Sequence, residues 1–251
     1  MAPITLTREN IFKWLTFGLI EAARVLRALL TRRPDRVTEV AEHVERNAVP
    51  GDPYDVLVEI DTFSYRNRFL MNVGEEKGAI LLHQLRETGA TRALELGAYC
   101  GYSAILMGLH LAPSGGRLVS LDANSHNASM ARRIVKHAGL QDTIDFKVGK
   151  ASELIGELEG PFDVVFIDHW KDDYLKDLLH LEQRGLLRPG ARIVADNVGI
   201  FRKALQPYLN YVRESPEYES THYPTRMEYN DTIADGVEVS VWRSAAARRA
   251  A

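Results

Sequence analysis

Two short polar segments carry the side chains of this chain that are best suited to chemistry. Asp168 directly follows one apolar run that predicts a buried strand, and Asp196 and Asn197 follow another. Two carboxylates and one carboxamide are oxygen ligands that suit Mg²⁺, which leaves its other positions to water or substrate. Lys171, three residues after the first ligand, can remove a proton from a hydroxyl held there. The pattern predicts a metal-assisted active site.

The composition is that of a soluble globular protein, with 45% apolar and 26% charged residues. Its 251 residues fit one large α/β domain more readily than two small ones. The net charge of −3 gives no electrostatic reason to expect a nucleic-acid partner. The single cysteine, Cys100, excludes an internal disulfide and is compatible with a reducing compartment, so we expect a cytoplasmic protein.

Residues 11–30 are densely apolar, yet they do not predict a membrane span. A spanning helix needs about 20 mostly apolar residues, and Lys13, Glu21, Arg24 and Arg27 interrupt this run. A signal peptide is not expected either, because no small-residue cleavage site follows a short apolar core.

The same segment predicts an amphipathic helix, capped by Thr7 or Asn10. Its apolar residues at helical spacing are Ile11, Trp14, Leu15, Gly18, Ala22, Val25, Leu26 and Leu29. We therefore expect a helical extension over 1–33 and a domain over 34–245. Docking on the domain or on a second subunit is favoured, because the apolar face is what any docked helix needs. Peripheral membrane contact, which the arginines suit, remains an alternative, and so do monomer and homodimer.

From residue 92 onward, strand and helix patterns alternate, which predicts a parallel sheet with helices on both faces. Two later strand-like segments have no helix between them and predict an antiparallel pair at the sheet edge. Helices are expected before the first strand, at 35–47 with Asp35 as its cap, from 53 and at 71–87. A later helix is expected up to residue 137, with Asn124 as its cap, and a further one at 202–213. The expected strands are 93–96, 117–121, 143–148, 162–167, 191–195, 218–223 and 237–242.

A glycine turn after the first strand predicts a cofactor site. Gly97 and Gly101 let the backbone approach a ligand closely at the carboxyl end of that strand. Asp122 ends the next strand, where a carboxylate accepts hydrogen bonds from both hydroxyls of a ribose. The alternative for Asp122 is a cap on the helix that starts at Asn124. Together the features indicate an adenosine-containing ligand without a tightly held pyrophosphate, S-adenosylmethionine rather than NAD.

Several segments together resemble the catechol O-methyltransferase family. They are residues 50–53, 71–74, 95–103, 168–172, 195–197 and 221–223, and the resemblance runs in order from about Asn47 to Trp242. It implies a Rossmann-like methyltransferase fold: an α/β structure with a seven-stranded, mostly parallel sheet and an antiparallel last strand. It also implies that S-adenosylmethionine and Mg²⁺ are the cofactors.

The resemblance assigns a role to each site residue. Asp168, Asp196 and Asn197 would bind the metal, Lys171 would act as the general base, and Glu228 would bind the second hydroxyl. The cofactor would contact Val73, Glu95, Gly97, Tyr99 and Ser103 at its methionine end, Asp122 at the ribose, Ser152 and His169 at the adenine, and also Asp168. The substrate would contact Met71, Trp170, Lys171, Asn197 and Glu228.

Three of these residues have ordinary alternatives. Without the resemblance to the family, Trp170 and Met71 would be interpreted as core residues and Glu228 as a solvated loop glutamate.

The chain also departs from the family pattern. Phe69 stands where a tryptophan usually guards the pocket mouth, Asp122 replaces a glutamate, Ala123 replaces a methionine, and a proline is missing shortly after Asn197.

The function predicted is Mg²⁺- and S-adenosylmethionine-dependent O-methylation of one hydroxyl of catechols, a small-molecule substrate. One alternative is a larger ortho-diphenol acceptor, such as a hydroxycinnamoyl conjugate or a secondary metabolite. Another is a protein that binds the cofactor or a membrane without catalysis. The complete set of Asp168, Lys171, Asp196, Asn197 and Glu228 argues against that last alternative.

Overall fold

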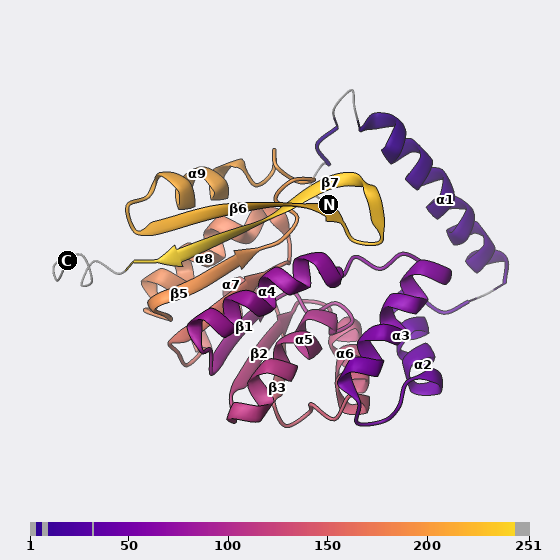
Figure 1. Ribbon diagram of the computed structural model, residues 1–251, viewed down its shortest axis with the longest axis horizontal. Coiled ribbons are helices and arrows are strands. Elements are labelled where there is room, and N and C mark those ends of the chain that lie inside the picture. The colour runs from indigo at the N-terminus through magenta and orange to yellow at the C-terminus, as the bar shows by residue number, and fades with distance from the viewer. Residues whose placement is uncertain (1–3, 7–9, 32, 244–251) are drawn as a thin grey trace.

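The computed structural model describes residues 4–6, 10–31 and 33–243. In this part of the chain, helices cover both faces of a central sheet (Figure 1). The helices are α1 (Ile11–Leu30), α2 (Arg36–Asn47), α3 (Pro53–Arg66), α4 (Gly74–Thr88), α5 (Tyr102–Leu111), α6 (Ser125–His137), α7 (Ala151–Leu154), α8 (Tyr174–Gln183) and α9 (Gln206–Glu214), with short 3₁₀ turns η1 (Ala112–Ser114), η2 (Ile155–Glu157) and η3 (Lys171–Asp173). The strands are β1 (Arg92–Leu96), β2 (Arg117–Asp122), β3 (Ile144–Val148), β4 (Phe162–Ile167), β5 (Leu187–Ala195), β6 (Tyr218–Met227) and β7 (Asn230–Trp242).

The sheet has seven strands in the order β3-β2-β1-β4-β5-β7-β6. Neighbours among β1 to β5 pair in parallel, while β7 runs antiparallel to both β5 and β6. The predicted α/β fold with an antiparallel last strand is therefore confirmed. The last two strands are longer than predicted, and β7 lies inside the sheet, so the edge strand on that side is β6.

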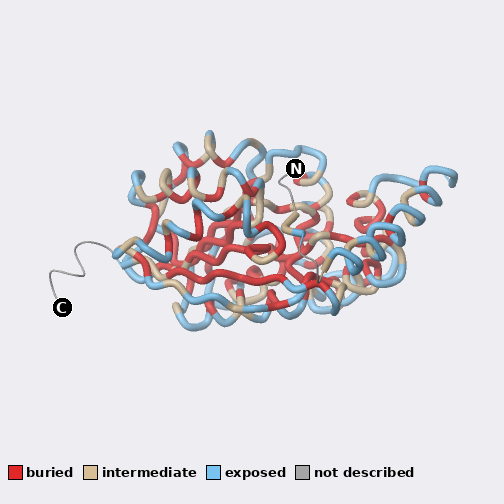
Figure 2. The backbone as a smooth tube through the Cα atoms, turned by 90° about the horizontal axis from the view of Figure 1, so that it is seen from above, coloured by how far each residue is buried: buried red, intermediate tan, exposed pale blue. Residues whose placement is uncertain are grey.

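The central strand β4 is buried at every position, as expected for a strand covered on both faces. Its side chains alternate between two apolar cores: Val164 and Phe166 join one, and Val165 and Ile167 join the other. Figure 2 shows the buried sheet running through the molecule, with exposed residues on the surrounding helices and loops. The two cores fix the strand ends, where the polar segments begin.

The capping predictions for two helices are confirmed. The carboxylate of Asp35 and the side-chain oxygen of Asn124 each accept hydrogen bonds from two backbone N–H groups in the first turn of α2 and α6. The side chain of Asn10, in contrast, makes no capping hydrogen bond to α1, and Thr7 lies outside the described residues.

Two helices begin later than predicted. The helix α4 begins at Gly74, so Met71 precedes it in an irregular segment. The helix α9 begins at Gln206 rather than at Arg202. Pro207 stands at the start of α9, and proline favours the first helical turn because its missing N–H needs no partner there.

The helix α1 contacts the domain through a narrow face. Trp14 and Phe17 pack against the second core, and Glu21 and Ala28 are buried. Docking on the domain is therefore correct, but the predicted apolar stripe is the wrong face, because most of its large side chains are solvent-exposed. The exposed large apolar residues of α1 are Ile11, Phe12, Leu15, Leu19, Ile20, Leu26, Leu29 and Leu30.

None of the helices in the described ranges is long and apolar enough to cross a membrane.

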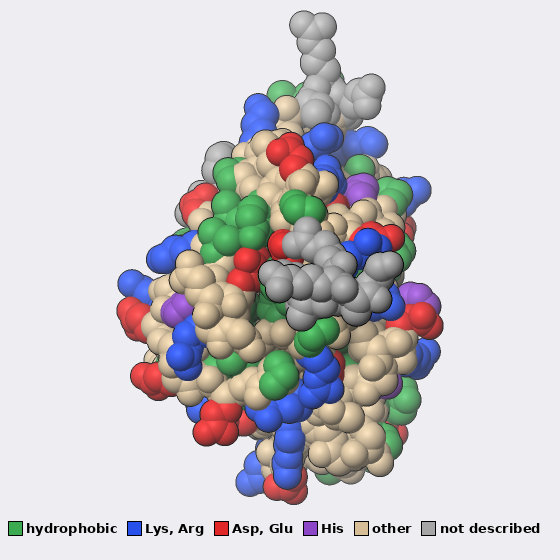
Figure 3. Space-filling view, turned by 90° about the vertical axis from the view of Figure 1, so that its left-hand side faces the viewer, with side chains coloured by type: hydrophobic (Ala, Val, Ile, Leu, Met, Phe, Trp, Pro, Cys, Tyr) green, Lys and Arg blue, Asp and Glu red, His purple; other side chains and the backbone are tan. Residues whose placement is uncertain are grey.

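On the face drawn in Figure 3, acidic and basic side chains are interspersed. That distribution agrees with the small net charge of −3.

Candidate active site

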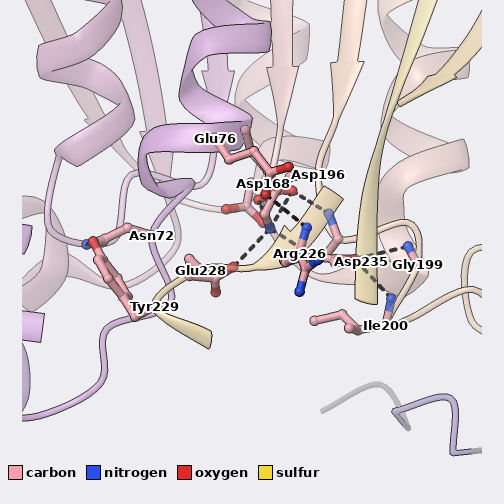
Figure 4. Close-up of polar contacts among 12 residues, drawn as sticks. Asn72, Glu76, Asp168, Asp196, Gly199, Ile200, Arg226, Glu228, Tyr229 and Asp235 are labelled. Atoms are coloured by element: carbon pink, nitrogen blue, oxygen red, sulfur yellow. Dashed lines mark hydrogen bonds and ion pairs between the residues drawn. The ribbon is translucent and has the colours of Figure 1, made fainter. Parts of the chain in front are cut away.

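The two polar segments lie at the carboxyl ends of the neighbouring strands β4 and β5 (Figure 4). The N–H of Asp168 donates to the carbonyl of Leu96 at 2.9 Å, and the N–H of Asp196 donates to the carbonyl of Ile167 at 3.1 Å. These bonds extend the parallel ladder past the strand ends. Ligand sites in open α/β sheets lie at this edge.

Lys171 is held between two oxygen atoms beside the strand ends. Its Nζ lies 2.7 Å from Asp168 Oδ1 and 2.7 Å from the hydroxyl of Tyr174. That hydroxyl donates in turn to the carbonyl of Asp196 at 3.2 Å. Burial raises the pKa of Tyr174 well above its usual value, so the hydroxyl keeps its proton. A hydrogen-bonded path thus joins Lys171 to the second polar segment.

A buried lysine that the sequence patterns did not single out lies behind Asp196. The Nζ of Lys77 is 2.8 Å from Asp196 Oδ1, 2.9 Å from Glu228 Oε2 and 2.9 Å from Asp235 Oδ2. Figure 4 shows the three acidic residues drawn together by these contacts. Burial alone would lower the pKa of Lys77, but the carboxylates raise it well above its usual value. The side chain is therefore a charged ammonium.

The three carboxylates around Lys77 respond differently to burial. Burial raises the pKa of Asp196 well above its usual value and raises that of Glu228, and Lys77 opposes both shifts. For Asp235, burial acts in the same direction, but Lys77 and the N–H of Ile200 outweigh it, so this pKa is lowered. Asp235 is therefore the carboxylate of this cluster for which the charged form is favoured.

Asn197 presents an oxygen without a partner. Its backbone φ of 59° is in the left-handed region, which is uncommon for a residue with a side chain. Its Nδ2 donates to Asp235 Oδ2 at 3.2 Å, while its buried Oδ1 has no hydrogen-bond partner. An unpaired buried oxygen calls for an explanation, and a bound cation supplies one. Asp168, Asp196 and this amide oxygen are oxygen donors of the kind that Mg²⁺ prefers.

Within the described residues, no three His, Cys, Asp or Glu side chains form a group that could hold a metal by themselves. The fit to Mg²⁺ therefore depends on the amide of Asn197 as well as on two carboxylates.

A cavity of about 930 Å³ opens beside the strand ends. This volume is near the top of the usual range of about 300–1,000 Å³ for a small-molecule site, so a cofactor and a small acceptor can share it. The structure brings many of the predicted site residues to its wall: Met71, Gly97, Tyr99, Asp122, Ser152, Asp168, His169, Trp170 and Lys171.

Asp122 holds the glycine turn in place. Its Oδ2 accepts hydrogen bonds from the N–H groups of Ala98 at 3.1 Å and Tyr99 at 2.9 Å. It is not the cap of α6, because Asn124 has that role. A carboxylate fixed by the turn and facing the cavity remains suited to ribose hydroxyls, and that contact stays a prediction.

Three predicted cofactor residues do not line this cavity. Glu95 is fully buried and accepts hydrogen bonds from the hydroxyls of Ser103 and Ser120. Burial raises the pKa of Glu95 to about 7, although both serines act against this shift. Ser103 is also buried, and Val73 is a buried residue that lines a separate, smaller pocket. Glu95 and Ser103 therefore support the floor of the glycine turn in this structure.

Glu228 is also buried, so its interpretation as a solvated glutamate is wrong. It lines a separate pocket of about 200 Å³ together with Asp61 and Tyr229, among other residues. Its link to the predicted metal ligands runs through Lys77. Contact between Glu228 and an acceptor stays a prediction.

The structure places three aromatic residues relative to the cavity. Trp170 is 60% exposed, so it belongs to the cavity rim and not to a core. Phe69 is buried beneath Phe17, with ring centroids 5.0 Å apart, so it does not form the pocket mouth. Phe201 lines the cavity in the segment after Asn197, where the family pattern has a proline. The centre of its ring is 5.5 Å from Lys171 Nζ.

Two residues of this cluster, Lys77 and Asp235, stand at apolar positions of regular sequence patterns. Lys77 shares the buried face of α4 with Leu81, four positions later. Asp235 alternates with Ile233 and Val237 on a buried face of β7. A charged residue at an apolar position of an otherwise regular pattern is rarely buried without a partner.

Comparison with known proteins agrees with this arrangement. Residues 50–239 match a family described as O-methyltransferase. The catechol O-methyltransferase of Mus musculus is 42% identical over 209 residues, which cover 81% of this chain and 77% of that protein. The catechol O-methyltransferase of Bos taurus is also 42% identical over 209 residues, covering 81% and 75%.

A solved O-methyltransferase from Bacillus cereus, in complex with SAH, has the same fold. It superposes with a TM-score of 0.64 at 24% identity and covers 82% of this chain and 97% of its own. The sequence match, the sheet order and the cavity at the strand ends lead to one conclusion: this chain belongs to the O-methyltransferase family.

Proposed function

We propose that this protein transfers a methyl group from S-adenosylmethionine to one hydroxyl of a catechol, with Mg²⁺ bound by Asp168, Asp196 and Asn197. The observation that carries the proposal is the position of Lys171 on the cavity wall, 2.7 Å from Asp168 Oδ1. The identity to catechol O-methyltransferases supports the acceptor class.

When bound, S-adenosylmethionine supplies the methyl group, and Mg²⁺ supplies a Lewis acid that makes an adjacent hydroxyl more acidic. The remaining work falls to residues of the chain. Lys171 accepts the hydroxyl proton, and Tyr174 fixes the direction of its amine. Met71 and Trp170 line the cavity, where they would border the acceptor ring and help to orient it for transfer.

A larger ortho-diphenol, such as a hydroxycinnamoyl conjugate, is the second candidate acceptor. The observation in its favour is the exposed position of Trp170 on the rim, because the cavity is open to solvent there. Rates with catechol, phenol and a hydroxycinnamoyl conjugate would separate the candidates. The proposal requires methylation of catechol and none of phenol, which lacks the second hydroxyl. A preference for the conjugate by more than tenfold would favour the second candidate.

The outward face of α1 supports a proposal about location. Its exposed apolar side chains, flanked by Lys13 and Arg27, fit peripheral contact with an anionic membrane surface.

We further propose that the protein is cytoplasmic, that it is a monomer or a homodimer, and that it has no nucleic-acid partner.

A further inference from the structure

We propose that Asp235 and Lys77 are positioning residues that hold the predicted metal ligands Asn197 and Asp196, together with Glu228, in their working orientation. This inference rests on the proposed Mg²⁺-dependent function. Lys77 lines the smaller pocket beside Glu228, whereas Asp235, Asp196 and Asn197 line neither pocket. The positioning role rests on the direct contacts of Lys77 and Asp235 with these residues.

Both carboxylate oxygens of Asp235 accept hydrogen bonds. Its Oδ1 accepts hydrogen bonds from the N–H groups of Gly199 at 3.1 Å and Ile200 at 3.0 Å. Its Oδ2 accepts from Asn197 Nδ2 at 3.2 Å and from Lys77 Nζ at 2.9 Å. The carboxylate is therefore fixed by the chain that follows the predicted metal ligands.

This geometry decides which way the amide of Asn197 points. Because Asp235 accepts from the NH₂ group, the amide oxygen must point away from Asp235. That oxygen is the buried atom without a hydrogen-bond partner. A carboxylate at position 235 therefore selects the amide orientation that offers oxygen, not nitrogen, to a cation.

The backbone around Asp235 is shaped for this contact. A β-carbon on Gly199 would lie 2.6 Å from the Cα of Asp235. Only glycine allows the turn after Asn197 to approach β7 this closely. The approach brings two backbone N–H groups onto the same carboxylate oxygen.

Lys77 fixes the other half of the cluster. It reaches from α4 to both oxygens of Asp196, at 2.8 and 3.1 Å, and to Glu228 at 2.9 Å. Since Glu228 follows β6 and Asp196 follows β5, one ammonium joins two strand ends that are not neighbours in the sheet. Removing it would leave three buried carboxylates to repel each other.

The first test is Asp235→Asn, which keeps the size of the side chain. The new amide can still accept from Gly199 and Ile200, but it presents NH₂ to the NH₂ of Asn197. Partners of metal ligands typically contribute about 10- to 100-fold to metal affinity. We expect Mn²⁺, measured by calorimetry as a probe of the site, to bind 10- to 100-fold more weakly, with S-adenosylmethionine affinity within about twofold. Asp231→Asn, an exposed carboxylate on the same strand, is the matched control.

The second test uses Lys77→Met and Lys77→Arg. We expect Lys77→Met to raise the catechol KM at least tenfold while S-adenosylmethionine still binds, because Glu228 and Asp196 lose their common partner. Lys77→Arg keeps the charge and should recover part of the loss. A purely structural lysine would lower stability without separating the catechol KM from cofactor affinity.

The outcomes of these tests distinguish the positioning role from the proposed Mg²⁺-dependent function. Mn²⁺ affinity within twofold of wild type in cofactor-binding Asp235→Asn would overturn the positioning role. An unchanged catechol KM in Lys77→Met would also overturn the positioning role. This second measurement still tests the role if Asp235→Asn does not fold. Failure of the wild-type protein to bind Mn²⁺ would instead remove the proposed metal site itself.

Discussion

The carbonyl oxygen of Asp168 lies 2.5 Å from the position that a β-carbon on Gly97 would occupy. The turn after β1 and the turn after β4 thus pass each other with no space for a side chain. Gly97 also has a φ of +107°, which residues with a side chain rarely adopt. The proposed cofactor turn and the proposed metal ligand therefore depend on one close backbone contact.

Replacing Gly97 by alanine should separate these two turns. We expect Gly97→Ala to lower the free energy of unfolding by at least about 2 kcal/mol, through backbone strain and steric overlap. S-adenosylmethionine affinity, measured by calorimetry, should fall at least tenfold. Gly185→Ala is the matched control, since Gly185 has a φ of +64° but no atom within 4 Å of the added carbon. Equal losses in both variants would show that strain alone, and not the contact with Asp168, matters.

Removing the amine of Lys171 should stop catalysis without affecting cofactor binding. General-base catalysis contributes about 10²- to 10⁴-fold, so kcat of Lys171→Met should fall by that factor. Lys176→Met, an exposed lysine on α8, should keep wild-type kcat. Turnover of Lys171→Met within threefold of wild type at neutral pH would exclude the proposed base.

Glu95 should make the cofactor-free protein less stable as pH rises. Its pKa is about 7 in the folded state and 4.5 ordinarily, so between these values the folded protein holds more protons than the unfolded chain. The free energy of unfolding must then fall with pH, by about 3 kcal/mol across the window. Denaturant unfolding at pH 4 and pH 8 should show this loss in wild type relative to Glu95→Gln. Parallel pH profiles of the two proteins would contradict a raised pKa.

The outward face of α1 should affect membrane binding and not chemistry. Leu15, Leu19 and Leu26 are more than half exposed, at 57%, 73% and 58%. Replacing all three by serine should abolish sedimentation with anionic vesicles and leave turnover of a soluble catechol within about twofold. Val58→Ser, at an equally exposed site on α3, is the control. Wild-type protein that does not sediment with vesicles would refute membrane contact.

The sequence predicted the parts of the fold that depend on local patterns. The caps Asp35 and Asn124, the alternation of strands and helices, and the polar strand ends all follow from neighbouring residues. Pairings between distant residues could not be predicted this way. Lys77 binds Asp196 from 119 positions away and Asp235 from 158 positions away, and no local periodicity encodes such distances.

The docking face of α1 illustrates the same limit. Most of its apolar stripe faces solvent, and the helix docks through one stripe residue, Trp14, together with Phe17 and the buried Glu21. Glu21 accepts a hydrogen bond from Arg36, which also donates to the carbonyl of Phe69 at 2.9 Å. A specific ion pair and ring contacts therefore decided the face, and only the three-dimensional structure shows them.

The proposed reaction is tested most directly by methyl transfer from labelled S-adenosylmethionine to catechol, first with Mg²⁺ and then with excess chelator. Labelled monomethyl product should form with Mg²⁺, disappear on chelation and form again when Mg²⁺ is restored. Product formation that continues unchanged in the chelator would contradict the role of Asp168, Asp196 and Asn197. Absence of product from folded protein that binds S-adenosylmethionine and Mg²⁺ would contradict the catechol as acceptor.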